Sequence, residues 1–266
     1  MQLQDRNIVV TGGGNGIGRA LVRRFAAESP RTLVVADVDG AAAQQVVDDL
    51  EAGFDCFAVE VDLATEQGNV DLVAAAEEYG PIDLLCLNAG IGVLGGVEVP
   101  DADWYRIWDI NVMAHVRAVR AALPGMLARG EGYILTTASA AGLLTNLGTA
   151  PYAVTKHAAV GLAEWLAITH GDQGIKVSCL CPQGVRTRML FPDDEDDGVA
   201  GESVRAQGVI EPEEVAEAVV AGLAEERFLI LPHPEVHDFV QRKAADPDRW
   251  LGGMRKLQRR VRDSSA

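Results

Sequence analysis

The sequence predicts a doubly wound α/β fold, in which a mostly parallel sheet of about seven strands carries helices on both faces. Three observations lead to this prediction. Short β-branched runs alternate with longer segments of helical periodicity, a glycine-rich turn joins the first predicted strand to the first predicted helix, and no repeat or low-complexity linker divides the chain. With 266 residues, 48% of them hydrophobic, the chain is long and apolar enough to bury one sizeable core.

Predicted strands and helices alternate along the chain. The strands are short runs rich in Val, Ile, Leu and Thr, at residues 7–11, 32–36, 54–61, 82–87, 132–137, 176–180 and 228–231. The helices have apolar residues at every third or fourth position, at residues 16–28, 41–52, 65–79, 101–129, 151–171 and 213–226. Asp101 at a helix start, Pro212 before an acidic first turn and Gly130 after a long helix agree with these limits.

The last residues of the chain differ in composition from the rest. Apolar residues there alternate with a basic set, Arg249, Arg255, Lys256, Arg259, Arg260 and Arg262. This pattern predicts a basic amphipathic helix over residues 246–266. Because the rest of the chain is strongly acidic, packing of this helix on its own subunit or on a neighbouring one is favoured over attachment to a membrane.

Charge and composition exclude several classes of function. A formal net charge of -16 argues against binding to nucleic acid, whose phosphates are bound by clustered Lys and Arg. No run reaches the length of about 18 apolar residues that a membrane span needs, and the first residues lack the features of an export signal, so we expect a cytoplasmic protein. The cysteines lack the spacing of a zinc site or a disulfide framework, which predicts buried thiols and no metal at Cys56, Cys86, Cys179 and Cys181.

The glycine-rich turn predicts a site for the pyrophosphate of a dinucleotide. Residues 11–18, with the sequence TGGGNGIG, follow the first predicted strand and precede the first predicted helix. Glycines let the backbone approach a phosphate closely, and a helix start offers free N–H groups and the positive end of its dipole. The spacing is TGxxxGxG rather than GxGxxG, because Ile17 stands where the second pattern needs its last glycine.

Asp37 predicts NAD rather than NADP as the dinucleotide. It ends the second strand, roughly 20 residues beyond the glycines, where a carboxylate accepts hydrogen bonds from both hydroxyls of the adenosine ribose. The same carboxylate would repel the extra phosphate of NADP. Val38 follows in place of an Arg, and the glycine turn contains no Arg or Lys, so no residue is evident that would bind that phosphate.

Tyr152, Lys156 and Ser139 predict proton-transfer chemistry on an alcohol or ketone. Tyr152 and Lys156 are four positions apart at the start of a predicted helix, which places both on one face. An ammonium beside a phenol favours the phenolate, so we expect a pKa of Tyr152 below its reference of about 10. Ser139 follows the strand at 132–137, where its hydroxyl would hold the substrate oxygen.

Taken together, these residues resemble the short-chain dehydrogenase/reductase family. The resemblance is carried by TGxxxGxG at 11–18, Asn88-Ala89-Gly90, Asn111, Ser139 and Tyr152-Ala153-Val154-Thr155-Lys156, and it spans nearly the whole chain. It implies a Rossmann fold and an NAD-dependent oxidoreductase that acts on CH–OH groups. We therefore divide the chain into one Rossmann-fold catalytic domain, residues 1–245, with a substrate loop at about 183–208, and a C-terminal extension, residues 246–266.

The resemblance also implies a role for each site residue. Tyr152 is implied as the acid and base, Lys156 as a donor to the nicotinamide ribose, and Ser139 as the group that orients the substrate oxygen. Asn111 is implied to stabilise a kink in the long helix and to hold a water that links Lys156 to solvent. The residues implied to bind the cofactor are Gly12, Asn15, Gly16, Ile17, Gly18, Asp37, Val38, Asp62, Leu63, Asn88, Ala89, Gly90, Tyr152, Lys156, Pro182, Gly184, Val185 and Thr187.

One motif departs from the family pattern. The family usually has Pro-Gly after the sixth strand, then an apolar residue and a Thr that contact the carboxamide, whereas this chain reads Pro182-Gln183-Gly184-Val185-Arg186-Thr187. Gln183 in place of Gly leaves the path of the backbone open at this point. In the loop that follows, the acidic run at 193–197 fits a substrate lid and a solvated turn equally well.

The expected function is the NAD-dependent interconversion of a lipophilic secondary alcohol and its ketone. The loop at 140–150, which should border the substrate, is mostly small or apolar. The long helices near Asn111 and Tyr152 resemble those through which the family forms homotetramers or homodimers. Two alternatives stay open, an NADPH-dependent reductase of ketones or 3-oxoacyl thioesters and a non-catalytic NAD-sensing regulator. Asp37 with Val38 argues against the first, and the full set of proton-transfer residues against the second.

Overall fold

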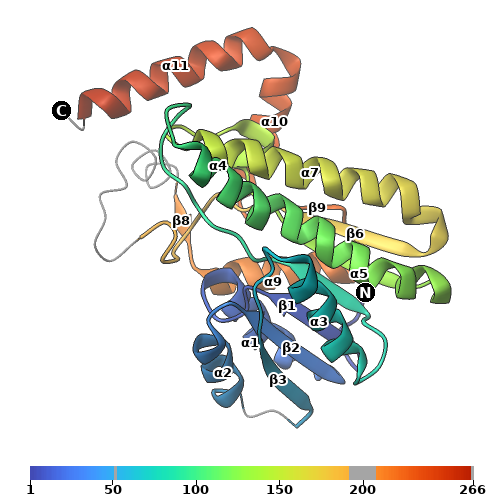
Figure 1. The fold of residues 1–266 in the computed structure, drawn as a ribbon. Helices are drawn as coiled ribbons and strands as arrows, with labels where there is room; N and C mark the ends of the chain where they lie inside the picture. Colours follow the sequence, from blue (N-terminus) through green and yellow to red (C-terminus); the bar gives the residue numbers. More distant parts are fainter. Residues whose placement is uncertain (51–52, 192–207, 265–266) are drawn as a thin grey trace.

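Seven parallel strands form one sheet at the centre of the molecule (Figure 1), in the order β3-β2-β1-β4-β5-β6-β9. The computed structural model describes residues 1–50, 53–191 and 208–264. The strands are β1 (Asn7–Thr11), β2 (Thr32–Asp37), β3 (Asp55–Glu60), β4 (Leu84–Leu87), β5 (Gly132–Thr137), β6 (Ile175–Leu180) and β9 (Leu229–Ile230). The predicted fold class is confirmed, and each predicted strand is present with limits that differ by one or two residues.

The order of the strands reverses next to β1. This strand pairs with β2 on one side and with β4 on the other. The chain therefore moves outward from β1 to β3, returns to the centre, and moves outward the other way from β4 to β9. Where the connections diverge in this manner, an open crevice forms outside the carboxyl ends of the strands.

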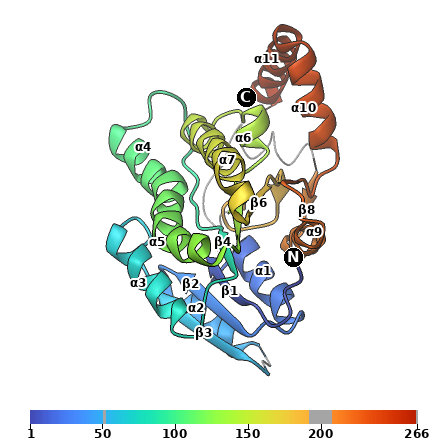
Figure 2. The same cartoon turned by 90° about the vertical axis from the view of Figure 1, so that its right-hand side faces the viewer.

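Helices cover both faces of the sheet (Figure 2). One layer contains α1 (Gly16–Ala26), α2 (Gly40–Asp48) and α9 (Pro212–Ala224), and the other contains α3 (Glu66–Glu77), α5 (Ala114–Arg129) and α7 (Ala150–His170). Neighbouring strand residues face opposite layers, so that Ile8 belongs to the same core cluster as Leu21, and Val9 to the other cluster with Ala159. Burial on both faces explains why the strands are continuous apolar runs rather than alternating ones.

The long helix predicted over residues 101–129 has an interruption. It consists of α4 (Asp101–Trp108), the π-helical segment η1 (Asp109–Met113) and α5. A π turn inserts one extra residue into the helical register, which the apolar periodicity alone does not reveal. The interruption contains Asn111, the residue for which the family resemblance implies a kink.

Several short elements were not predicted. They are α6 (Ala141–Leu144), the 3-10 helix η2 (Gly171–Gln173), α10 (Glu235–Ala245) and the two-residue strands β7 (Gly184–Val185) and β8 (Val209–Ile210), which pair with each other. The predicted C-terminal helix is present as α11 (Pro247–Ser264), which Figure 1 shows at the end of the molecule beyond α7. Residues 193–197 and most of the predicted substrate loop lie outside the described residues.

The four cysteines are free thiols. Cys86, Cys179 and Cys181 are buried, as predicted. The prediction is wrong for Cys56, which is half-buried because β3 is an edge strand of the sheet. The sulfur atoms of Cys179 and Cys181 lie 3.7 Å apart, since alternate residues of a strand share a face.

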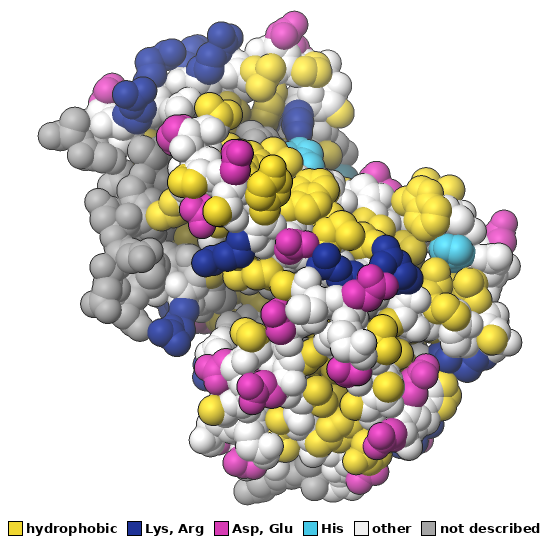
Figure 3. Space-filling model, viewed as in Figure 1, with side chains coloured by type: hydrophobic (Ala, Val, Ile, Leu, Met, Phe, Trp, Pro, Cys, Tyr) yellow, Lys and Arg dark blue, Asp and Glu magenta, His cyan; other side chains and the backbone are white. Residues whose placement is uncertain are grey.

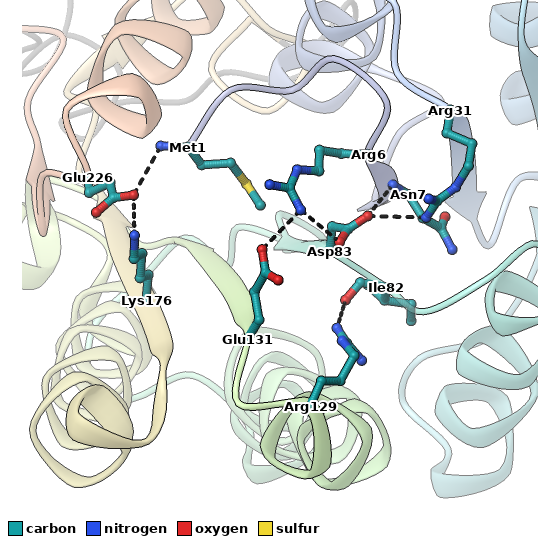
Figure 4. Close-up of polar contacts among 10 residues, drawn as sticks. All are labelled: Met1, Arg6, Asn7, Arg31, Ile82, Asp83, Arg129, Glu131, Lys176 and Glu226. Atoms are coloured by element: carbon teal, nitrogen blue, oxygen red, sulfur yellow. Dashed lines mark hydrogen bonds and ion pairs between the residues drawn. The ribbon is translucent and has the colours of Figure 1, made fainter.

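Charged side chains join the amino ends of four strands, at the opposite edge of the sheet from the glycine turn (Figure 4). The buried carboxylate of Asp83, just before β4, accepts a hydrogen bond of 2.7 Å from the backbone of Asn7. The same carboxylate lies 3.2 Å from both Arg6 and Arg31. Arg6 also lies 3.0 Å from Glu131, which precedes β5. These contacts connect the starts of β1, β2, β4 and β5.

None of the described helices combines the length and hydropathy that a membrane span requires.

Candidate active site

A cavity of about 730 Å³ opens at the carboxyl ends of the strands, where the strand order reverses. It begins at the glycine turn and Asp37, continues past the start of α7, and ends against α10 and α11. All predicted site residues line this cavity except Gly18, Asn111 and Gly184, which lie beside it. The structure therefore brings together residues that the sequence spreads over more than half of the chain.

The glycines of the turn are required by close backbone contacts. A Cβ atom on Gly18 would lie 1.9 Å from the carbonyl oxygen of Gly12. Gly12 itself has a φ of +63°, and a Cβ there would lie 2.9 Å from the Cα of Ala89. The turn therefore passes directly between α1 and the segment after β4, and larger residues would separate them.

The start of α1 is free to bind an anion. The N-cap residue Asn15 makes no side-chain capping bond, and the first turn of the helix contains no acidic residue. A Cβ on Gly16 would lie 3.2 Å from the side chain of Thr187, so the glycine keeps the space between this turn and the segment after β6 open. Free N–H groups, the helix dipole and an open glycine cradle fit a pyrophosphate.

Asp37 lies at the end of β2, directly beside the glycine turn. Its Oδ2 atom accepts a hydrogen bond of 2.9 Å from the backbone of Gly14, and its Oδ1 atom accepts one of 3.1 Å from Asp39. A carboxylate has about four acceptor positions, so two remain for hydroxyl groups in the cavity. Val38 beside it is 70% exposed and offers no positive charge to a phosphate. The site therefore fits an adenosine ribose with free hydroxyls.

Tyr152, Ser139 and Lys156 meet at the middle of the cavity. Tyr152 lies in the first turn of α7. Ser139 lies just after β5, and its hydroxyl accepts a hydrogen bond of 3.1 Å from the N–H of Ala141. The Nζ atom of Lys156 is 5.5 Å from the centre of the Tyr152 ring. This ammonium is almost fully buried and donates a hydrogen bond of 2.9 Å to the carbonyl of Thr137.

The pKa of Tyr152 shifts in the opposite direction from our expectation. Burial raises the pKa of Tyr152 above its ordinary value, and the neighbouring hydroxyl of Ser139 opposes this increase without overcoming it. The ammonium of Lys156 is directed to the Thr137 carbonyl. Burial also lowers the pKa of Lys156 to about 8. The residues of the chain alone thus keep the phenol protonated at neutral pH.

Asn111 positions backbone instead of lining the cavity. Its Oδ1 atom accepts a hydrogen bond of 2.8 Å from the N–H of Ile91, and its Nδ2 atom donates to the carbonyl of the same residue at 3.0 Å. Nδ2 also lies 3.2 Å from the hydroxyl of Thr155. Asn111 therefore fixes the segment after β4 against α7. A Cβ on Gly90 would meet both Asn111 and Lys156, so this segment passes close over them.

His233, which the sequence did not single out, holds the segment that departs from the family pattern. The buried imidazole accepts a hydrogen bond of 3.1 Å at Nδ1 from the N–H of Gln183. Its Nε2 atom lies 3.1 Å from the carbonyl of Gly184 and donates to it. The path of the backbone after β6, which the sequence left open, is therefore set by a side chain that follows β9. No sequence signal marks this contact, because it joins residues 50 positions apart.

Four residues of α10 and α11 also line the cavity and were not predicted as site residues. They are Phe239, Trp250, Met254 and Leu257. Three of them lie on α11 at spacings of four and three, which places them on one face of the helix. The apolar periodicity did reveal this face, but the sequence could not show what it covers.

Comparisons with known proteins match most of the chain. A family model described as short chain dehydrogenase matches residues 6–198. Meso-2,3-butanediol dehydrogenase of Serratia marcescens is 36% identical over 228 residues, which cover 84% of this chain and 89% of that protein. Cyclohexanol dehydrogenase of Acinetobacter sp. (strain SE19) is 32% identical over 238 residues, which cover 86% of this chain and 92% of that protein.

A solved structure has the same fold. A short chain dehydrogenase/reductase from Burkholderia phymatum, crystallised in complex with NAD, superposes with a TM-score of 0.84 at 32% identity. The match covers 93% of this chain and 96% of that one. The likeness therefore extends to nearly the whole of both chains.

Proposed function

The chain belongs to the short-chain dehydrogenase/reductase family, and we propose that it interconverts a lipophilic secondary alcohol and its ketone with NAD as the cofactor. Its dehydrogenase relatives make it an oxidoreductase that acts on CH–OH groups. The observation that carries the proposal is the meeting of Ser139, Tyr152 and Lys156 in one cavity with the glycine cradle.

In this proposal the side chains move and direct a proton. Tyr152 gives the proton of its hydroxyl to the ketone oxygen in reduction and takes it from the alcohol in oxidation. Ser139 donates a hydrogen bond that holds the same substrate oxygen. Lys156 provides a buried positive charge that stabilises the phenolate when the proton has left. When bound, the nicotinamide supplies or accepts the hydride at the carbon atom.

The preference for NAD over NADP rests on Asp37. Its two remaining acceptor positions suit ribose hydroxyls, and its charge opposes a phosphate at that place. The Burkholderia phymatum structure, crystallised with NAD, supports a nicotinamide cofactor. The alternative function within the family is an NADPH-dependent reductase of ketones or 3-oxoacyl thioesters. The preferred cofactor distinguishes this alternative from the proposed function.

A lipophilic substrate is supported by apolar side chains of the cavity that contains Tyr152. Leu94, Leu144, Met189 and Leu190 line this cavity. Apolar walls with few polar groups select apolar substrates. The butanediol and cyclohexanol dehydrogenases are both named for secondary alcohols, and of the two only cyclohexanol is mainly apolar.

We also propose that the chain forms a homotetramer or homodimer through α4 and α7. Figure 3 shows hydrophobic side chains gathered on the face that contains these helices. Tyr105 on α4 and Trp165 and Ile168 on α7 are large apolar side chains that are exposed. Large exposed apolar groups of this kind on one face mark a protein–protein contact.

The proposal is tested with a panel of secondary alcohols, from 2-butanol and cyclohexanol to bulkier compounds, assayed by the absorbance of the reduced nicotinamide. We expect oxidation of apolar alcohols with NAD and at least about tenfold lower kcat/KM with NADP. A higher kcat/KM with NADP would favour the rival reductase. Tight NAD binding without turnover of any alcohol or ketone would favour a regulator that only senses the dinucleotide.

A further inference from the structure

The far end of the cavity is closed by the C-terminal helices. Trp250, Met254 and Leu257 on α11 and Phe239 on α10 line the same cavity as Tyr152. The first three are half-buried, whereas Leu251, which lies outside this face of α11, is 54% exposed. The apolar face of α11 is therefore turned toward the cavity, although the rest of this helix is basic.

Contacts with the main domain fix these helices in place. Val236 of α10 is fully buried in a small core with Leu144 of α6. Lys243 near the end of α10 donates a hydrogen bond to the carbonyl of Leu143. The rings of Phe239 and Trp250, with centroids 6.2 Å apart, continue this packing from α10 to α11. The far wall of the cavity is thus built from ordered side chains.

Trp250 carries an unsatisfied hydrogen-bond donor at this wall. Its Nε1 atom is buried and has no hydrogen-bond partner among the residues that the structure describes. Burying an N–H group without an acceptor costs free energy, so native proteins rarely leave one unpaired. The Trp250 side chain packs in an apolar cluster with Phe239 and Val240. Because Trp250 also lines the cavity, a molecule that binds there can supply the acceptor.

We propose that α10 and α11 form a distal substrate subsite, for a long, mainly apolar secondary alcohol or ketone that carries a hydrogen-bond acceptor at its far end. Resting on the proposed function, this places the reacting oxygen at Tyr152 and the distal carbonyl or hydroxyl oxygen at Trp250 Nε1. Met254 and Leu257 contact the apolar part of the substrate between these ends. Short alcohols react at Tyr152 without reaching α11.

The donor is tested with Trp250→Phe, which keeps an aromatic ring in place and removes the N–H. Two substrates of similar length are compared, methyl 9-hydroxydecanoate, with an ester carbonyl far from its secondary alcohol, and 2-dodecanol, which has no second polar group. We expect kcat/KM for the ester to fall about tenfold in the variant and kcat/KM for 2-dodecanol to stay the same. Equal changes for both substrates would overturn the assignment of the donor.

The apolar wall is tested with Met254→Ala and Leu257→Ala, with Leu251→Ala as the control on the exposed side of the same helix. We expect each wall variant to lower kcat/KM for 2-dodecanol about tenfold and to leave 2-butanol unchanged. The control should behave as wild type with both alcohols. Loss of activity toward 2-butanol to the same degree would mean that α11 supports the fold and not a subsite.

A binding measurement separates this inference from the proposed reaction. Calorimetric titration of methyl 9-hydroxydecanoate into wild-type protein with NAD, and into Trp250→Phe, reports on the subsite even where no turnover occurs. Weaker binding by the variant supports the subsite whatever the reaction proves to be. Unchanged binding contradicts it, and turnover by the wild type in that case leaves the oxidoreductase proposal intact.

Discussion

The ionisable side chains around the cavity take their pKa values chiefly from burial. Burial raises the pKa of Tyr152 and lowers that of Lys156 to about 8. It also lowers the pKa of His115, buried beside them, to about 3, with the charge of Lys156 acting in the same direction. Each group is thus biased toward its neutral form, as expected where the protein excludes water. Additional positive charge near Tyr152 is needed to release its proton at neutral pH.

Substitution of Tyr152 tests the proton transfer. Tyr152→Phe should lower kcat by at least about a hundredfold, because the hydroxyl that exchanges the proton is lost, while NADH binding stays nearly unchanged. Tyr105→Phe, on the exposed face of α4, is the control and should keep full activity. Retention of wild-type kcat by Tyr152→Phe, measured with NADH binding by fluorescence titration, would exclude the assigned role.

The pH dependence of the wild type follows from the same residue. Because oxidation needs the phenolate and burial raises the pKa of Tyr152, the rate of alcohol oxidation should increase from neutral to alkaline pH. Ketone reduction needs the protonated phenol and should decline over the same range. Steady-state rates in both directions across this range measure the effect, and parallel profiles in the two directions would contradict it.

Asp37 should determine the choice of cofactor. Asp37→Ser removes the charge that opposes the phosphate of NADP and two acceptors for ribose hydroxyls, so the preference for NAD should narrow by about tenfold or more. Comparison of kcat/KM with NAD and NADP checks this. Asp39→Ser is the matched control, since Asp39 lies beside it and caps α2. A cofactor ratio equal to that of wild type would show that Asp37 does not contact the ribose.

At the scale of elements, the sequence predicted the helices and strands whose positions follow from local residue patterns. Strands buried on both faces, such as β1 and β2, are continuous apolar runs and could be predicted from composition. Ser139 and Tyr152 could be predicted because each stands in a motif of known spacing. The π-helical segment at Asn111 and the pair β7–β8 depend on hydrogen bonds that periodicity does not encode. The contact of His233 with Gln183 and the position of Trp250 in the cavity arise from tertiary packing. The part of the cavity from the glycine turn to Tyr152 was therefore predictable, and the part formed by α10 and α11 was not.

His233 should position the segment after β6 for the cofactor. His233→Leu keeps a similar volume but leaves the N–H of Gln183 and the carbonyl of Gly184 without their partner. We expect an increase of about tenfold in the KM for NAD and a loss of about 1–3 kcal/mol in the free energy of unfolding. His237→Leu, exposed on α10, is the control. A lower stability with an unchanged KM would reduce His233 to a purely structural residue.

At the scale of the molecule, stability and chemistry lie at opposite ends of the sheet. The carboxyl ends of the strands border the cavity, and the amino ends are joined by the ion pairs around Asp83. Parallel strands permit this separation because each strand has the same direction. Changes at the amino ends should therefore affect unfolding and not catalysis.

Asp83→Ala tests this separation. It removes the carboxylate that pairs with two partly exposed arginines and leaves the N–H of Asn7 without its acceptor, which should cost about 1–3 kcal/mol of unfolding free energy. Glu131→Ala, at the exposed end of the same network, should cost less than about 1 kcal/mol. Denaturant unfolding measures both, and kcat should match wild type in each variant. A reduced kcat in folded Asp83→Ala would mean that the two ends are coupled.

The proposed oligomer is tested on the exposed face of α7. Ile168→Glu places a charge where the side chain is 83% exposed in a single chain, so a monomer should tolerate it. If α7 forms the contact, sedimentation should show dissociation into smaller species. Val97→Glu, also highly exposed but on a loop, serves as the control and should not change the assembly. Identical sedimentation of both variants and the wild type would place the contact elsewhere.

The distribution of the cysteines has a practical consequence for chemical labelling. Thiolates, not thiols, react with maleimides, and burial raises the pKa of Cys56 to about 11 and that of Cys86 further still. The native protein should thus react slowly with such reagents, first at the edge strand and last in the interior. The order in which the thiols become modified would then record how the sheet opens, strand by strand, with no engineered probe.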